Sequence, residues 1–81
     1  MQLVLVTRQG CHLCEDARRH LTEMGYAPAL ADVDADEELF RLYDFRVPVV
    51  LVDGAPVVEG QITRERLEEA LKRSGRASDR P

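Results

Sequence analysis

Residues 3–14 read LVLVTRQGCHLC, an apolar run followed by a polar turn and two cysteines. The run Leu3–Val6 is too short for a helix and is typical of a strand buried on both faces. Gln9 and Gly10 indicate a turn. Beyond the turn, apolar residues recur at helical spacing at Leu13, Ala17, Leu21 and Met24. We therefore expect a strand, a turn and then a helix, ended by Gly25, whose first turn carries both cysteines.

The middle of the chain predicts a second strand and a second helix. Residues 26–33 have the composition of a strand, and Pro28 places it at a sheet edge because proline cannot donate a ladder hydrogen bond. Asp34–Asp36 can cap a short helix. The aromatic residues Phe40, Tyr43 and Phe45 are expected to pack in the core or at its rim. Strand, helix and strand in this order imply a right-handed parallel crossover.

The C-terminal half predicts a hairpin and a last helix. Val49–Val52 has the pattern of a third buried strand, and Asp53-Gly54 indicates a tight hairpin to Val57-Val58. Thr63 is a good N-cap for the helix that follows, which Gly75 is expected to end. We expect a domain over residues 1–75 and a flexible tail over residues 76–81.

The expected element order is β-α-β-α-β-β-α. This order places the chain in the α/β class, with a four-stranded mixed sheet flanked by helices. The parallel pair comes first in the sequence and the antiparallel hairpin last.

Composition limits the kinds of partner that fit the chain. Its 81 residues are 44% apolar and 32% charged, with a net charge of -4, as expected for one small folded domain. The acidic balance, the 5% aromatic content and the lack of Trp argue against nucleic-acid binding. Residues 1–6 lack a positive leader region and are too short to span a membrane, so we expect a cytoplasmic protein that does not bind membranes. We also expect the protein to be a monomer.

Cys11 and Cys14, spaced C-x-x-C, are the candidate catalytic residues. A disulfide across so short a loop adds little stability, and a reducing cytosol disfavours permanent disulfides. The pair is better suited to making and breaking a bond reversibly. A helix start supplies free N–H groups and a partial positive charge, which favour a thiolate. Cys11 is therefore expected to attack, and Cys14 to resolve the mixed disulfide.

Residues near the cysteines are candidate substrate contacts. Arg8 and His12 are the nearest cations; His12 either tunes the Cys11 thiolate or is simply an exposed polar residue. Arg46 is a weaker candidate for a substrate contact. The backbone of Val47, before Pro48, could pair with an extended substrate segment. The expected partners are a disulfide-containing protein or a small thiol, together with an unidentified reductant.

These features together resemble the glutaredoxin branch of the thioredoxin superfamily. The resemblance rests on the C-x-x-C after the first strand, on Val47-Pro48 opening a later strand, on Asp53-Gly54 and on the element order. It covers residues 2–73. It implies a thioredoxin/glutaredoxin-like fold, a cis Pro48, and thiol–disulfide oxidoreductase activity with Cys11 as nucleophile and Cys14 as resolving residue. It implies no bound cofactor beyond the redox-active disulfide Cys11–Cys14.

The chain departs from glutaredoxins at the positions that recognise glutathione. Glutaredoxins usually carry Gly-Gly-x-x-Asp after the hairpin, where this chain has Val58-Glu59-Gly60-Gln61-Ile62. They also usually have Thr where Arg46 stands. These departures argue against glutathione as the reductant.

Two alternatives to redox chemistry remain open from the sequence. Cys11, Cys14 and His20 could supply three ligands to zinc or an iron–sulfur centre, but a closed structural zinc site needs a fourth. We therefore predict no metal site within one chain. The other alternative is a redox-inert interaction module on the same fold, because a fold alone does not determine function.

Overall fold

The computed structural model describes residues 2–79, with side chains up to Ser74. The elements follow the expected order, with a short 3₁₀ helix, η1, added before α2. They are β1 (Leu3–Thr7), α1 (His12–Glu23), β2 (Ala29–Asp32), η1 (Val33–Ala35), α2 (Glu37–Tyr43), β3 (Val49–Val52), β4 (Ala55–Glu59) and α3 (Arg64–Asp79). None of the helices in this range has the length and apolar content needed to cross a membrane.

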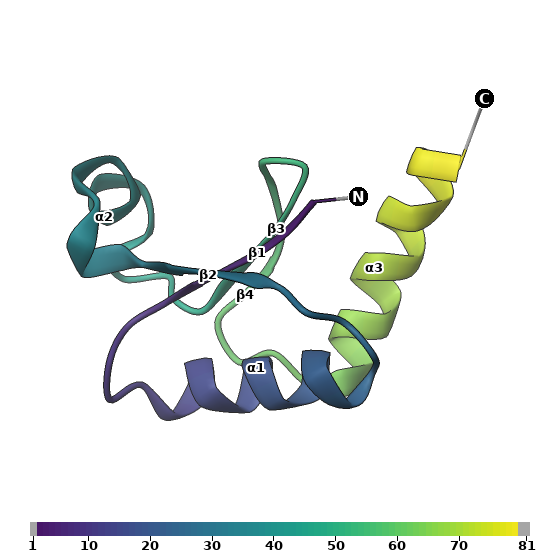
Figure 1. Cartoon of the computed structure of the whole chain (residues 1–81), viewed down its shortest axis with the longest axis horizontal. Helices are drawn as coiled ribbons and strands as arrows, with labels where there is room; N and C mark the ends of the chain where they lie inside the picture. The colour runs from purple at the N-terminus through teal and green to yellow at the C-terminus, as the bar shows by residue number, and fades with distance from the viewer. Residues whose placement is uncertain (1, 80–81) are drawn as a thin grey trace.

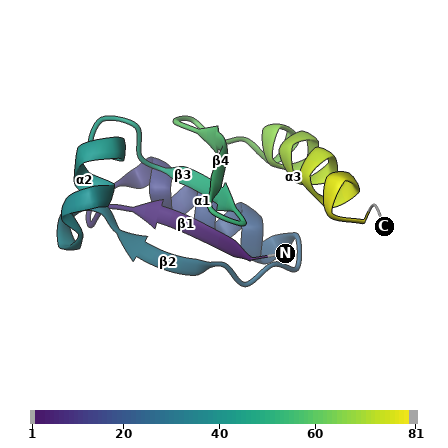
Figure 2. The ribbon, with the colours of Figure 1, turned by 90° about the horizontal axis from the view of Figure 1, so that it is seen from above.

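The four strands form one mixed sheet in the order β2-β1-β3-β4 (Figure 2). β1 pairs in parallel with β2, while β3 is antiparallel to both β1 and β4. β2 is an edge strand, as Pro28 predicted. Asp53 and Gly54, both with positive φ, make the tight turn between β3 and β4, which confirms the predicted hairpin. The α/β thioredoxin-like architecture is therefore confirmed.

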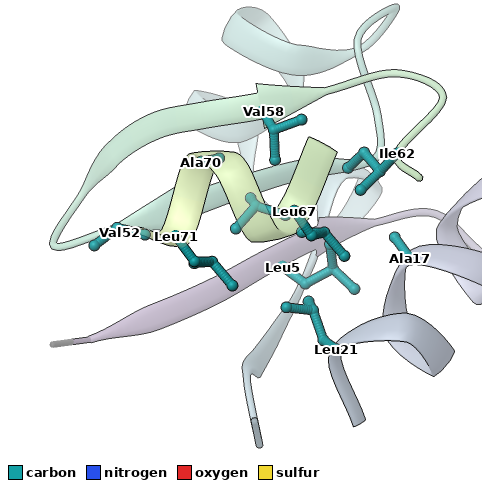
Figure 3. Packing of buried hydrophobic residues seen from close by; sticks show 10 residues of the cluster. Leu5, Ala17, Leu21, Val52, Val58, Ile62, Leu67, Ala70 and Leu71 are labelled. Carbon is teal, nitrogen blue, oxygen red and sulfur yellow. The ribbon is translucent and has the colours of Figure 1, made fainter. Parts of the chain in front are cut away.

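Helices cover both faces of this sheet. α1 and α3 lie on one side, while α2 packs at one end on the other side (Figures 1 and 2). The core under α1 and α3 is built from aliphatic side chains of both helices and the central strands (Figure 3). Its members are Leu5, Ala17, Leu21, Val50, Val52, Val58, Ile62, Leu67, Ala70 and Leu71. A smaller cluster under η1 and α2 contains Val6, Val33, Tyr43, Val49 and Leu51.

Alternation along the central strands explains why both faces need a cover. Successive side chains of a strand point to opposite faces, and Leu5 lies in the first cluster while Val6 lies in the second. All four residues of β3 are buried. A strand buried on both faces reads as a continuous apolar run, which is why this one was recognisable from sequence.

Two predicted boundaries were wrong. β2 begins at Ala29, after Pro28, and ends where η1 begins at Val33, so it is shorter than residues 26–33. α3 runs through Gly75 to Asp79, because a glycine ends a helix only when its backbone turns left-handed, and Gly75 keeps helical backbone. The helix thus enters the expected tail of residues 76–81. Residues 80–81 lie outside the described residues, and tail flexibility stays a prediction.

Three apolar side chains lie further outward than their patterns predicted, and one of them is Phe40 of α2, which is 46% exposed. Phe45 is 97% exposed rather than packed in the core or at its rim. It stands between the end of α2 and β3, where no other element covers it. Leu13 is 41% exposed, because it lies in the first turn of α1, beyond the residues that face the sheet.

The N-cap of α3 gives the first testable prediction. Thr63 Oγ1 accepts a hydrogen bond from the Arg66 N–H at 3.1 Å. Thr63→Ala should lower the free energy of unfolding by about 1 kcal/mol, because the amide loses its partner. Urea unfolding of the oxidised protein measures this. Thr22→Ala is the control: the Thr22 hydroxyl bonds the Arg18 carbonyl at 2.9 Å within α1 and caps nothing. Equal losses in the two variants would contradict the capping role.

Candidate active site

Cys11 is the N-cap of α1. Its backbone is extended (φ -97, ψ 108), its carbonyl accepts the first helical hydrogen bond from Glu15 at 3.1 Å, and its Sγ accepts from the Cys14 N–H at 3.1 Å. Gly10, with φ +74, makes the turn that brings the chain from β1 to this position. A sulfur in this place receives a backbone N–H and faces the positive end of the helix dipole, and both favour its thiolate form.

The two cysteines form a disulfide, with their Cα atoms 5.2 Å apart. Cys14 is only 3% exposed, whereas Cys11 is half-buried and so the more accessible of the two sulfurs. The expected greater exposure of Cys11 is confirmed, and the order in which the two sulfurs react stays a prediction. The pair is chemically competent for reversible thiol–disulfide exchange.

The Val47–Pro48 peptide lies at the same edge of the sheet as the cysteine turn. β1 and β3 are antiparallel with Val6 opposite Val49, so the residues before β3 adjoin the end of β1, from which the chain turns to Cys11. The peptide is cis, as the resemblance implied. The Pro48 carbonyl accepts a hydrogen bond from the Gly60 N–H at 2.9 Å. Among the described residues, the backbone N–H and C=O of Val47 have no hydrogen-bond partner.

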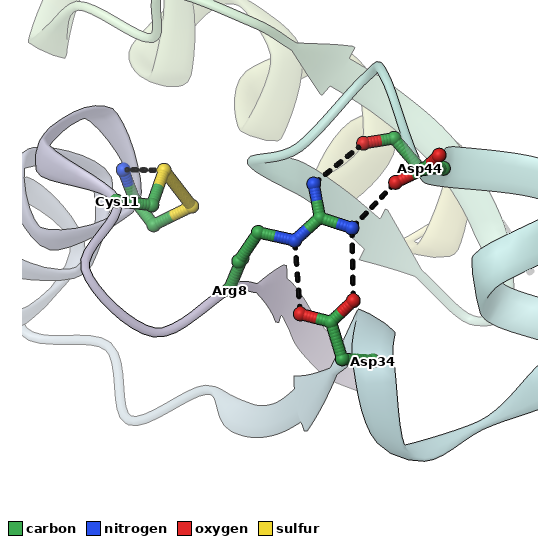
Figure 4. Close-up of a disulfide and its surroundings, with 5 residues drawn as sticks. Arg8, Cys11, Asp34 and Asp44 are labelled. Carbon is green, nitrogen blue, oxygen red and sulfur yellow. Dashed lines mark hydrogen bonds and ion pairs between the residues drawn. A yellow bond between two sulfur atoms is a disulfide. The ribbon is translucent and has the colours of Figure 1, made fainter.

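Arg8, between β1 and the cysteine turn, is held by two carboxylates (Figure 4). Its Nε and Nη2 donate to the two oxygens of Asp34, each at 2.9 Å. Its Nη2 also donates to Asp44 Oδ1 at 2.5 Å, and its Nη1 to the Asp44 carbonyl at 3.1 Å. The guanidinium lies 6.0 Å from the centre of the Phe40 ring. Arg8 thus ties the end of β1 to η1 and to the end of α2.

Comparison with known proteins places the chain in a family. The family model described as Glutaredoxin-like domain (DUF836) matches residues 2–72. The chain belongs to this glutaredoxin-like family. Together, this family and the Cys11–Cys14 pair fit a thiol oxidoreductase.

Solved structures agree with the family assignment. The structural genomics target protein XcR50 from X. campestris superimposes with a TM-score of 0.78 at 30% identity, covering 88% of this chain and 96% of that one. The thioredoxin-like protein BC3987 gives a TM-score of 0.69 at 26% identity, over 85% and 99% of the two chains. A search of curated proteins gave no match.

The glutaredoxin-like chain carries an ion pair where glutaredoxins would have Thr and Gly-Gly. Arg46 Nε donates to both oxygens of Glu59, at 3.1 and 2.9 Å, and its Nη2 donates to Oε1 at 2.5 Å. The guanidinium lies 5.1 Å from the centre of the Tyr43 ring. Hydrogen bonding to Arg46 holds the pKa of Glu59 below its ordinary value, so the pair stays ionised at neutral pH. Arg8 and Arg46 therefore already have carboxylate partners.

An open cleft of about 430 Å³ lies beside the disulfide, on the β2 side of α1. Arg8, Arg18, Glu15 and Asp32 supply its charged walls, and the other lining residues are Thr7, Gln9, Gly10, Cys14 and Leu30. The cleft is a consequence of the parallel pairing, which places Thr7 opposite Asp32 so that the ends of β1 and β2 face the start of α1.

The structure does not assemble the three ligands of the metal alternative. Within residues 2–79, no group of three His, Cys, Asp or Glu side chains is placed to hold a metal ion. His20 is in the last turn of α1, whereas both cysteines are at its start. The His20 Nδ1 is buried without a hydrogen-bond partner. The side chain of His12 is exposed at the helix start and forms no hydrogen bond among the described residues.

Sequence reasoning missed Asp34 and Asp44 as part of the site. Asp34 was expected only as one of the residues Asp34–Asp36 that could cap α2, and within that range the cap is Asp36, whose side chain accepts from the Leu39 N–H at 3.0 Å. The predicted parallel pairing of the first two strands nevertheless contained an indication of the contact between Arg8 and Asp34. Parallel strands bring their carboxyl ends to one edge, so Arg8 after β1 and Asp34 after β2 could have been placed together. Nothing in the sequence marked Asp44.

Proposed function

We propose that this protein is a thiol–disulfide oxidoreductase that uses Cys11 and Cys14 as a dithiol. The observation that carries the proposal is the position of the disulfide: Cys11 caps α1 and is partly accessible, while Cys14 is buried one turn below it. A structural disulfide gains little from closing so short a loop. A redox disulfide needs one accessible sulfur with a stabilised thiolate, which the helix start supplies.

The reaction begins from the reduced protein. The Cys11 thiolate attacks one sulfur of a substrate disulfide, so that a mixed disulfide forms as the substrate S–S bond breaks and one substrate thiolate leaves. Deprotonated Cys14 then attacks Cys11 Sγ, forming the intramolecular disulfide and releasing the second substrate thiolate. Two electrons pass from the protein to the substrate, and the protons lost by the cysteines are available to the products. Two equivalents of an external thiol restore the dithiol.

The substrate contacts belong to the same proposal. The unpaired backbone N–H and C=O of Val47 lie at the edge of the sheet that the cysteine turn also reaches, and they suit an extended segment carrying the target disulfide. Pro48, which follows Val47, fixes the backbone immediately before β3. His12 is exposed at the helix start and free to contact a partner. We assign Arg8 to the charge balance of the site rather than to direct substrate contact, because four of its five N–H donors already bond Asp34 and Asp44.

A trapping experiment tests the assignment of the two sulfurs. Cys14→Ser, reduced and then mixed with a small neutral disulfide, should accumulate a stoichiometric adduct on Cys11, because the resolving thiol is absent. Intact and peptide mass spectrometry read out the site. In the matched variant Cys11→Ser, the buried Cys14 should label far more slowly. Preferential labelling of Cys14 would reverse the roles.

The electron donor and the compartment complete the proposal. A reversible disulfide of this kind functions in a reducing compartment, so we assign the protein to the cytoplasm. The donor is an external thiol other than glutathione, since Val58–Ile62 lack the Gly-Gly-x-x-Asp pattern and Glu59 is bonded to Arg46.

A further inference from the structure

The charge of Arg8 is cancelled by carboxylates of the protein itself. A guanidinium three residues before the attacking cysteine would by itself attract anionic substrates. Here it makes four hydrogen bonds to Asp34 and Asp44, and the two carboxylates outweigh its single positive charge. Hydrogen bonding to Arg8 also holds the pKa of Asp34 below its ordinary value, so that the carboxylate remains charged at neutral pH.

The charged side chains that line the cleft beside the disulfide balance one another. Its walls carry Arg8 and Arg18 together with Glu15 and Asp32. When Asp34 and Asp44 are included, two arginines and four carboxylates leave two net negative charges around the cleft, whose wall includes Cys14, the disulfide partner of Cys11. Arg46 adds no net positive charge, because Glu59 pairs with it at 2.5 Å.

We propose that Asp34 and Asp44, by cancelling the charge of Arg8, make the dithiol select against anionic disulfides and in favour of neutral or cationic ones. The inference rests on the proposed function and names the class of substrate for the same site. The chemical step is unchanged: Cys11 attacks the substrate disulfide, and one substrate sulfur leaves as a thiolate. The selectivity comes from the energy of bringing a charged disulfide to the cleft, which depends on the local field.

Competing single-turnover reactions of the reduced protein measure this selectivity. The anionic probe is glutathione disulfide, the cationic probe is cystamine, and the neutral probe is hydroxyethyl disulfide. The quantity of interest is the ratio of the rate constants for the anionic and cationic probes, since a change in thiol reactivity affects both rates equally. The Asp34→Asn, Asp44→Asn double variant should raise this ratio about five- to tenfold at low ionic strength, because two negative charges are removed while Arg8 is kept.

The control keeps the overall charge change and moves it away from the site. Glu68 and Glu69 lie on α3 and pair with Arg64 and Arg73 at 3.5 and 3.9 Å. The Glu68→Gln, Glu69→Gln double variant should change the ratio less than about twofold. Arg8→Gln should move the ratio in the opposite direction, downward by about two- to threefold. In about 1 M salt all of these differences should collapse.

Several results would overturn the inference. One is an equal ratio in the aspartate double variant and the α3 control, and another is a rise in the ratio in both Arg8→Gln and the aspartate variant. If the double variant does not fold, as judged by circular dichroism, Asp34→Asn alone should change the logarithm of the rate-constant ratio by about half as much. Wild-type protein that fails to react with even the neutral probe would refute the proposed function itself, which is a different outcome from an unchanged ratio.

Discussion

Cys11→Ser should lower the rate of disulfide exchange at least about a thousandfold, which is the largest effect expected of any single substitution in this protein. A serine hydroxyl stays protonated at neutral pH and needs a hydrogen-bonded base to become a nucleophile, whereas the partner of the side chain at position 11 is the N–H of residue 14, a donor. The remaining thiol, Cys14, is 3% exposed and cannot replace Cys11. Single-turnover kinetics of the reduced variant with a neutral disulfide measure the loss.

Cys14→Ser is the matched comparison for this loss. It should keep the first attack within about tenfold of the wild-type rate, since Cys11 still caps α1 and accepts the N–H of residue 14. Only the second step, release of the substrate from the mixed disulfide, should fail. Equal loss of the first step in both variants would show that the two sulfurs do not have separate roles.

Leu67→Ala should lower the free energy of unfolding by about 2–5 kcal/mol, the range for removing a fully buried leucine side chain. Leu67 is 0% exposed and packs α3 against β4 and α1 in the larger core cluster. A domain of this size has only about 5–10 kcal/mol of stability, so the melting temperature should fall by more than about 10 °C. Thermal and urea unfolding of the oxidised protein, with the disulfide intact, measure both quantities.

Leu42→Ala is the control for this prediction. Leu42 is 40% exposed on α2, so its truncation should cost less than about 1 kcal/mol. The comparison tests whether α3 is an integral part of the core rather than an appended helix. A similar small loss for both variants would contradict the packing of α3 described above.

Much of the fold followed from local patterns in the sequence. Continuous apolar runs identified β1 and β3, and Asp53-Gly54 identified the hairpin. Pro28 placed β2 at the edge, and Thr63 marked the start of α3. These features are predictable because burial on two faces, a missing N–H and a capping hydroxyl are properties of a few neighbouring residues.

Helix ends were less predictable. Gly75 was expected to end α3, but a glycine only permits the left-handed backbone of a helix end and does not impose it. The exposure of Leu13 and Phe45 was equally hard to predict from the sequence, because their apolar character says nothing about whether another element covers them.

The sequence by itself determined where the candidate redox residues lie: two cysteines at a helix start, one turn apart, with the more N-terminal one more accessible. Only the tertiary structure decided the electrostatics of the site. Arg8 is 26 residues from Asp34 and 36 residues from Asp44, and a parallel crossover followed by the return of β3 brings all three together. Reactivity depends on local backbone geometry, which neighbouring residues specify. The charge that a substrate meets depends on which distant side chains share one edge of the sheet, and that is set by the topology.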